Sequence, residues 1–181
     1  MTKETAMLRE LAREYFALAR QERNAERLRL HRAVNDLKMI RPVVLIDELP
    51  WSEMDIGDEL TVRCTDPVLA GIERFFRLNL YKYKHFPADM VLRPYVPVSK
   101  VIYSTGNGVA VKEEILRTDE KNGIVSHRYT DQFETDADLA KLRVPVISYD
   151  KEETLRRYEL AGEVLGDIIP VKITGREYYH I

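Results

Sequence analysis

The chain has 181 residues, of which 45% are hydrophobic and 32% charged, and its net charge at pH 7 is -2. This is the composition of a globular domain, and it predicts neither a nucleic-acid partner nor a membrane partner. Cys64 is the single cysteine, which excludes an internal disulfide, and no stretch approaches the roughly 18 to 20 apolar residues of a membrane span, so we expect a cytoplasmic protein.

The N-terminal segment, residues 1–38, is expected to be helical. It contains no glycine or proline and is rich in Ala, Leu, Arg and Glu, which favour helices. An apolar stripe with helical spacing starts at Leu8 and ends at Leu18, and the almost wholly polar stretch Arg20–Arg27 then interrupts it. The interruption predicts a bend, two separate helices or an exposed arm.

Three apolar runs predict parallel strands over residues 42–47, 89–93 and 168–174. A strand that is covered on both faces is a near-continuous run of Val, Ile and Leu, as these runs are. Pro94 and Pro97 are expected to end the second strand, because proline cannot donate to a central ladder. In an α/β barrel, functional groups lie at the C-terminal ends of such strands.

The segments between these runs carry local signals for helices and a hairpin. Thr65–Pro67 combines a capping side chain with a proline, which predicts the start of a helix. Residues 108–133 are expected to form a β-hairpin that turns at Asn122–Gly123. Thr135 with Asp138 predicts a short helix, and Asp150 with Glu153 predicts a longer one.

This order of elements resembles the N-terminal part of the uroporphyrinogen decarboxylase-like superfamily, which includes tetrapyrrole decarboxylases and corrinoid-linked methyltransferases. The resemblance rests on element order and on the motifs Arg41–Glu48, Phe86–Pro94 and Gly166–Gly175. It implies an α/β fold in which residues 39–181 form the first three strands of a TIM (β/α)8-type barrel, with the hairpin as an insertion. A complete barrel needs about 250 residues, so either the chain is a fragment or a partner completes the sheet.

Two departures from the family pattern predict a non-classical branch. Family decarboxylases carry an arginine-rich segment after the first strand, whereas residues 47–53 of this chain are acidic. They also carry an aspartate near the end of the second strand, where this chain has Arg93 and Pro94. The resemblance therefore implies methyl transfer linked to a corrinoid or thiol, or decarboxylation of a small substrate, rather than classical uroporphyrinogen decarboxylation. The alternative is a non-catalytic α/β binding or assembly module.

The resemblance also bears on cofactors and partners. Family methyltransferases bind zinc through a His-x-Cys pair and a distant cysteine late in the barrel, and Cys64 has no histidine at ligand spacing. We therefore expect no metal site and no cofactor within this chain, while zinc and corrinoid remain possible for the intact protein. The expected partners are a small-molecule substrate, a corrinoid protein if the reaction is corrinoid-linked methyl transfer, and either the remainder of the barrel or an oligomer partner.

Candidate site residues follow the first two predicted strands. Asp47 and Glu48 could act as a general base or bind a cationic or hydroxyl group, or could equally be solvated carboxylates or ion-pair with the first helix. Trp51 could supply a stacking wall. Arg93 could bind a carboxylate or phosphate or pair internally, and Tyr95 is included with it among the substrate-binding candidates.

The remaining candidates lie on the third strand and on the hairpin. Lys172 and Thr174 share one side of the strand, and Gly175 allows a ligand to approach the backbone, although a structural ion pair is the alternative for Lys172. We expect Asp47 or Glu48 to contact Lys172 or Arg93. His127 shares a face with Tyr129 and Asp131, which predicts a proton-handling or metal-binding surface, or else a polar face without a role.

Overall fold

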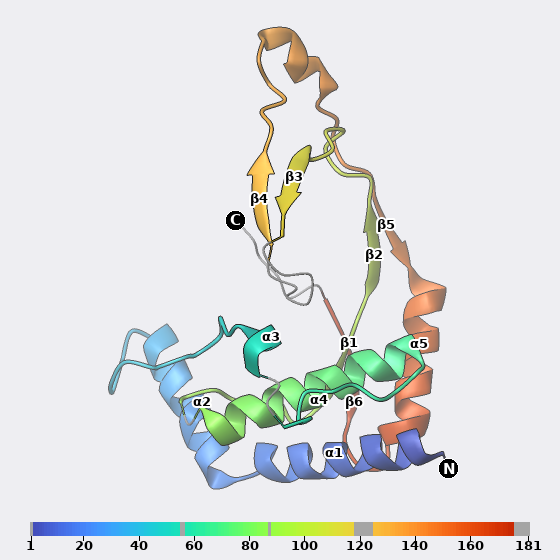
Figure 1. The fold of residues 1–181 in the computed structure, drawn as a ribbon. Helices are drawn as coiled ribbons and strands as arrows, with labels where there is room; N and C mark the ends of the chain where they lie inside the picture. The colour runs from blue at the N-terminus through green and yellow to red at the C-terminus, as the bar shows by residue number, and fades with distance from the viewer. Residues whose placement is uncertain (1, 55–56, 87, 118–124, 176–181) are drawn as a thin grey trace. The chain divides into compact units, whose positions relative to one another are not determined.

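The computed structural model describes residues 2–54, 57–86, 88–117 and 125–175 (Figure 1). The chain divides into two units: unit 1 comprises Met1–Ser99 and Glu152–Ile181, and unit 2 comprises Lys100–Lys151. The helices are α1 (Lys3–Ala19), α2 (Glu22–Asn35), α3 (Trp51–Met54), α4 (Pro67–His85), the 3-10 helix η1 (Asp136–Lys141) and α5 (Lys151–Leu165). The strands are β1 (Val96–Ser99), β2 (Val101–Ser104), β3 (Glu113–Leu116), β4 (Ser126–Tyr129), β5 (Ile147–Asp150) and β6 (Val171–Thr174).

The described chain is mixed α/β, as the sequence predicts. Its strands pair as three two-stranded sheets, β1–β6, β2–β5 and β3–β4. Only the β1–β6 pair is parallel, whereas the other two are antiparallel. Among the described residues these sheets do not close into a barrel.

The N-terminal segment forms two helices, which settles the three alternatives left by its polar interruption. The Thr2 side chain caps α1 by accepting a hydrogen bond from the Thr5 N–H at 3.1 Å. The chain leaves the first helix at Arg20 and enters the second at Glu22. The apolar stripe of α1 is buried, and Tyr15 lies at its centre in the core.

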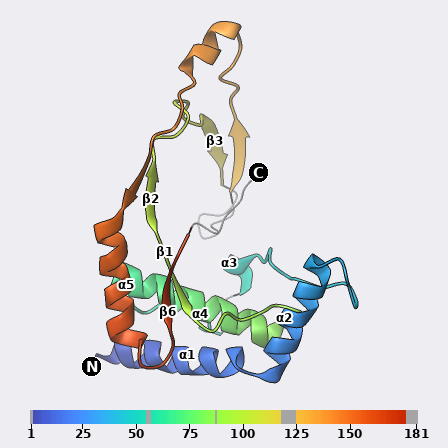
Figure 2. The ribbon, with the colours of Figure 1, turned by 180° about the vertical axis from the view of Figure 1, so that it is seen from behind.

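Helix α4 begins where the sequence predicts. The Asp66 side chain accepts hydrogen bonds from the N–H groups of Val68 at 2.9 Å and Leu69 at 3.0 Å, and Pro67 occupies the first turn. Helices α4 and α1 run side by side (Figure 1 and Figure 2). Phe76 of α4 contacts the Tyr15 ring, with 5.2 Å between ring centroids, and both side chains are fully buried.

A buried carboxylate anchors the loop that precedes α4. Glu73 has no exposed surface, and its Oε2 accepts hydrogen bonds from the N–H groups of Arg63 at 2.9 Å and Cys64 at 2.7 Å. The other oxygen, Oε1, pairs with Arg77 Nε at 2.7 Å. Burial by itself raises the pKa of Glu73, but these donors outweigh it, so the pKa lies below its ordinary value.

The prediction that proline ends the second strand is wrong, because β1 contains Pro97. In the parallel ladder, the Val96 N–H donates to the Pro170 carbonyl at 2.9 Å. Backbone direction alternates along a strand, so the Pro97 nitrogen points to the opposite edge of β1, where the described chain has no strand. Proline therefore removes no hydrogen bond from this ladder.

The strands predicted over residues 42–47 and 89–93 are also wrong, because neither stretch is a strand. The Asp89 carboxylate joins them, pairing with Arg41 at 2.6 Å and accepting from the Val44 N–H at 3.0 Å. Val44 is 55% exposed, so the apolar run is not covered on both faces as a central strand is. The Asp89 N–H also donates to the Val44 carbonyl at 2.9 Å, so the two stretches are held by one carboxylate and one backbone hydrogen bond instead of a ladder.

Polar side chains of α2 form hydrogen bonds with backbone groups of residues 89–92, which a neighbouring strand would bind in a sheet. Asn24 donates to the Leu92 carbonyl at 2.9 Å and accepts from the Leu92 N–H at 2.8 Å, as a paired peptide group would. Arg27 donates to the Met90 carbonyl at 3.2 Å, and His31 Nε2 lies 2.7 Å from the Asp89 carbonyl oxygen. One face of α2 therefore supplies hydrogen-bond partners for backbone groups of residues 89–92.

Unit 2 consists of the two antiparallel ladders and η1. The predicted hairpin is confirmed by the pairing of β3 with β4, in which Ile115 lies opposite His127, while the predicted Asn122–Gly123 turn lies outside the described residues. The predicted short helix is η1, in which Thr135 and Asp138 form a capping box. The predicted longer helix is α5, which begins at Lys151 and leads into β6.

Candidate functional site

The acidic residues after the first predicted strand lie against α4. Asp47 forms an ion pair with Lys82 of α4, in place of the predicted contact with Arg93 or Lys172. This prediction assumed that residues 42–47 are a strand of the sheet, which they are not. Glu48 is exposed.

Trp51 and Arg93 are both held by unit 1 but in different surroundings. Trp51 begins α3 and meets the Tyr81 ring edge-on, with 6.2 Å between ring centroids. Arg93 lies near α1, where burial raises the pKa of Tyr15 to about 12 against the opposing effect of a hydrogen bond from the Arg93 backbone. These contacts give both residues structural surroundings, and their roles as substrate-binding groups stay predictions.

His127 lies in unit 2, on the hairpin. Its Nδ1 is 2.9 Å from Glu113 Oε2, and its ring is stacked on Tyr129 with 5.8 Å between ring centroids. The predicted common face is therefore confirmed for His127 and Tyr129. Asp131 instead accepts a hydrogen bond from the Phe133 N–H at 2.9 Å.

The β1–β6 pair gathers three of the predicted site residues. Val96 and Val98 direct one face of β1 into the core, and their partners on β6 are Val171 and Ile173. The intervening residues of β6, Lys172 and Thr174, therefore share the other face. This outer face comprises Pro97, Ser99, Lys172 and Thr174, and Tyr95, which precedes β1, lies on it as well.

One contact and one unpaired hydroxyl characterise this outer face. The Lys172 ammonium lies 4.6 Å from the centroid of the Tyr95 ring, a cation–π distance. The Thr174 hydroxyl is buried and has no hydrogen-bond partner in the described part of the chain. Buried polar atoms almost always have partners, so this hydroxyl near the C-terminal end of the strand is an exception among the described residues. Gly175 follows directly.

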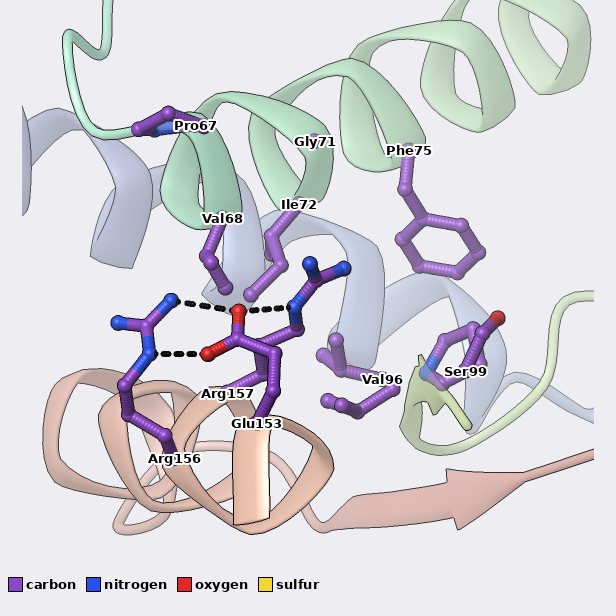
Figure 3. Close-up of a pocket in the computed structure, with 12 residues that line it drawn as sticks. Pro67, Val68, Gly71, Ile72, Phe75, Val96, Ser99, Glu153, Arg156 and Arg157 are labelled. Carbon is purple, nitrogen blue, oxygen red and sulfur yellow. Dashed lines mark hydrogen bonds and ion pairs between the residues drawn. The ribbon is translucent and has the colours of Figure 1, made fainter. Parts of the chain in front are cut away.

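A pocket of about 460 Å³ lies in unit 1 between α4, β1 and α5, and Pro97 and Ser99 of β1 are among its lining residues (Figure 3). Its apolar walls include Val68, Ile72 and Phe75 of α4 and Val96 of β1. Its polar side is formed by charged residues in the first two turns of α5. An apolar cavity with a few convergent polar groups is the usual form of a small-molecule site.

The charged side of this pocket is an arginine pair held by one carboxylate (Figure 3). Glu153 pairs with Arg156 Nε at 2.6 Å and with Arg157 Nε at 2.8 Å. These two hydrogen bonds lower the pKa of Glu153 to about 2. Two guanidinium groups around one carboxylate leave a net positive charge at the pocket.

Sequence reasoning missed this arginine pair. Its only local signal is the spacing of Glu153, Arg156 and Arg157, which places both arginines on the same helix face as the glutamate. That spacing is common on solvated helices. The opposing apolar wall comes from α4, far away in the sequence, so no local pattern reveals the pocket.

Across the described ranges, no group of three or more His, Cys, Asp and Glu side chains is placed to hold a metal ion. Within the same residues, no helix has both the length and the apolar character needed to cross a membrane. Comparisons with protein-family models, with curated proteins and with solved structures find no match.

Proposed function

We propose that the chain is the N-terminal portion of a uroporphyrinogen decarboxylase-like enzyme with a TIM-type barrel. The reaction is methyl transfer to a corrinoid or thiol, or decarboxylation of a small substrate, and it is not classical uroporphyrinogen decarboxylation. The observation that carries the proposal is the parallel β1–β6 pair, because α5 leads directly into β6 and the polar face of the pair contains Lys172 and Thr174.

In this proposal the outer face of β1–β6 becomes the inner face of the barrel, where substrate binds. Lys172 binds the carboxylate of the substrate, and the Tyr95 ring holds the ammonium in place when the site is empty. The Thr174 hydroxyl donates a hydrogen bond to the substrate, and Gly175 lets it approach the backbone. Asp47 and Glu48 do not belong to this face, which leaves Lys172 as the principal charged group.

Completion of the barrel requires further strands, supplied by other sequence or by a partner. The N–H groups that face the free edge of β6 all belong to residues other than proline, whereas Pro97 removes one donor from the free edge of β1. The next strand therefore adds to β6.

The residues described here do not fit the zinc site of the family methyltransferases. The Cys64 thiol is buried and hydrogen-bonded to Glu73, and burial is the main cause that raises its pKa to about 12. A thiol in this state is a poor metal ligand. Any zinc site of this kind therefore belongs to sequence outside the described residues.

A pair of activity assays on the protein that carries this chain tests the proposal. One measures methyl transfer from methylcobalamin to a small thiol, and the other measures decarboxylation of uroporphyrinogen. We expect activity in the first, a KM raised about tenfold or more by Lys172→Gln, partial rescue by Lys172→Arg, and no effect of Lys38→Gln at an exposed site. Robust turnover of uroporphyrinogen would refute the non-classical assignment.

The second candidate function is a non-catalytic binding module, which the α4–β1–α5 pocket favours. Arg157 uses only Nε to hold Glu153, so in the described chain its two terminal nitrogens remain able to donate to a ligand carboxylate. Octanoate combines a carboxylate with an apolar chain that matches the Val68 and Phe75 wall. Calorimetric binding of octanoate that is lost in Arg157→Gln, without turnover in either assay, would favour this candidate.

A further inference from the structure

Unit 2 contains a large share of the exposed apolar surface of the described chain. It spans Lys100–Lys151, little more than a quarter of the sequence, yet it holds twelve of the twenty exposed large hydrophobic side chains. Val101 is its one buried residue among those described. A polypeptide of this length that buries almost nothing cannot offset the entropy lost on ordering its backbone.

The β2–β5 ladder shows where this apolar surface lies. Ile102 lies opposite Tyr149, and Ile147 lies two residues before Tyr149 on the same face. Tyr103 and Val146 occupy the other face, since the ladder continues through a hydrogen bond from the Thr105 N–H to the Val146 carbonyl. A ladder that is apolar on both faces is typical of a sheet that is covered on both sides.

Two-stranded ladders also leave backbone groups open at their edges. An isolated two-stranded sheet is at best marginally stable in water and gains stability from a third strand or a packed surface. In the described chain, β2–β5 and β3–β4 each have two such edges. An antiparallel pair of identical strands is related by a two-fold axis, so each edge can pair with the same edge of a second copy.

We propose that unit 2 is an association arm through which two copies of this chain form a symmetric dimer. The twelve exposed side chains together leave on the order of 1,000 Å² of apolar surface open, which is comparable with the roughly 800 Å² per partner of a stable interface. The arm sequence has eight Lys and Arg against nine Asp and Glu, so two arms do not repel each other electrostatically.

The β3–β4 hairpin supplies the second part of this surface. Its Ile115 and Tyr129 are at least half exposed and share one face with the stacked His127 ring. Tyrosine and histidine rings present large, rigid contact area at low entropic cost, which suits a protein interface. The Glu113–His127 contact is then a polar pair at its margin.

Sedimentation equilibrium of the full chain tests this proposal with a matched pair of substitutions. Ile147 in the arm is 62% exposed and Ile40 in unit 1 is 64% exposed, so the same change at each removes the same surface. We expect a wild-type dimer at micromolar concentration, a dimer dissociation constant raised about tenfold or more by Ile147→Glu, and no change with Ile40→Glu. Ile147→Thr keeps a β-branched residue in the strand and should weaken the dimer in the same direction.

Hydrogen exchange of the wild-type chain provides an independent readout that needs no variant. We expect amides of β2, β5, β3 and β4 to become more protected as protein concentration rises, while those of α1 and α4 do not change. A wild-type chain that stays monomeric, equal effects of the Ile147 and Ile40 substitutions, or arm protection that is independent of concentration would each overturn the proposal. None of these outcomes depends on the enzymatic proposal above.

Discussion

The Asn24 side chain forms with Leu92 the two hydrogen bonds that a neighbouring strand would form, and its loss should lower the stability of the protein. Asn24 is buried near the start of α2, and it donates to the carbonyls of Ala19 and Leu92 while accepting from the Leu92 N–H. Asn24→Leu is close in volume but makes none of these bonds. It leaves both backbone groups of the fully buried Leu92 without a protein partner.

The magnitude follows from the cost of unsatisfied buried groups. Each costs about 1 to 3 kcal/mol, so we expect Asn24→Leu to lower the free energy of unfolding by about 3 kcal/mol, after the gain from the added apolar side chain. This is a large part of the roughly 5 to 15 kcal/mol of a typical domain. Urea unfolding followed by far-UV circular dichroism should show a midpoint lowered by about 1 to 3 M.

The control for this experiment lies on the same helix. Asn35 is the last residue of α2 and is exposed, so Asn35→Leu should change the free energy of unfolding by less than about 0.5 kcal/mol. If Asn24→Leu has an equally small effect, then the Asn24 side chain does not hold residues 89–92, and the reasoning is refuted.

Three further predictions rest on single groups of the structure. Because the pKa of Glu153 is lowered to about 2, its contribution to stability is complete above its ordinary pKa and is lost as pH falls toward 2; Glu153→Gln should flatten this part of an acid-unfolding curve. The raised pKa of Cys64 keeps its thiol protonated at neutral pH, so Ellman's reagent should react with it only as fast as the protein unfolds, and rapid reaction of the native chain would contradict its burial. Gly108 has a φ of +87°, and an added Cβ would lie 2.5 Å from the Lys141 carbonyl oxygen. Gly108→Ala should therefore destabilise unit 2 by about 1 kcal/mol or more and speed amide exchange in β2–β5. Gly57→Ala should have no such effect, because a Cβ at Gly57 has no atom within 4 Å.

The elements that the sequence predicts correctly are those with short-range causes. The Asp66 cap, the Thr135 capping box and the β3–β4 hairpin each depend on residues close in the chain, and each is where it was expected. The strands over 42–47 and 89–93 depended on partners far away. An apolar run need not join a ladder, and here side chains of Asp89 and of α2 supply most of the hydrogen bonds.

Helix α2 shows why those partners could not be identified in advance. Asn24, Arg27 and His31 lie at spacings of three and four, so they share one helix face, and a polar face of this kind is usually solvated. Whether it faces water or a backbone depends on what the rest of the chain places against it. The sequence shows that these three polar residues share one helix face, but it does not show what that face contacts.

The candidate site divides in the same way between local and distant causes. Once β6 is known to be a strand, its period of two places Lys172 and Thr174 on one face, and pairing with β1 adds Tyr95. The predicted contact of Asp47 with Arg93 or Lys172 required a pairing between distant strands, whereas the structure pairs its carboxylate with Lys82, 35 residues away in the chain. Recognising the arginine pair of α5 as part of a pocket requires the apolar wall on α4, and no residue near Glu153 in the sequence indicates that wall. The residues for which sequence reasoning is strongest are therefore Lys172 and Thr174, and a substitution at Lys172 tests the proposed enzyme more directly than one at any acidic residue.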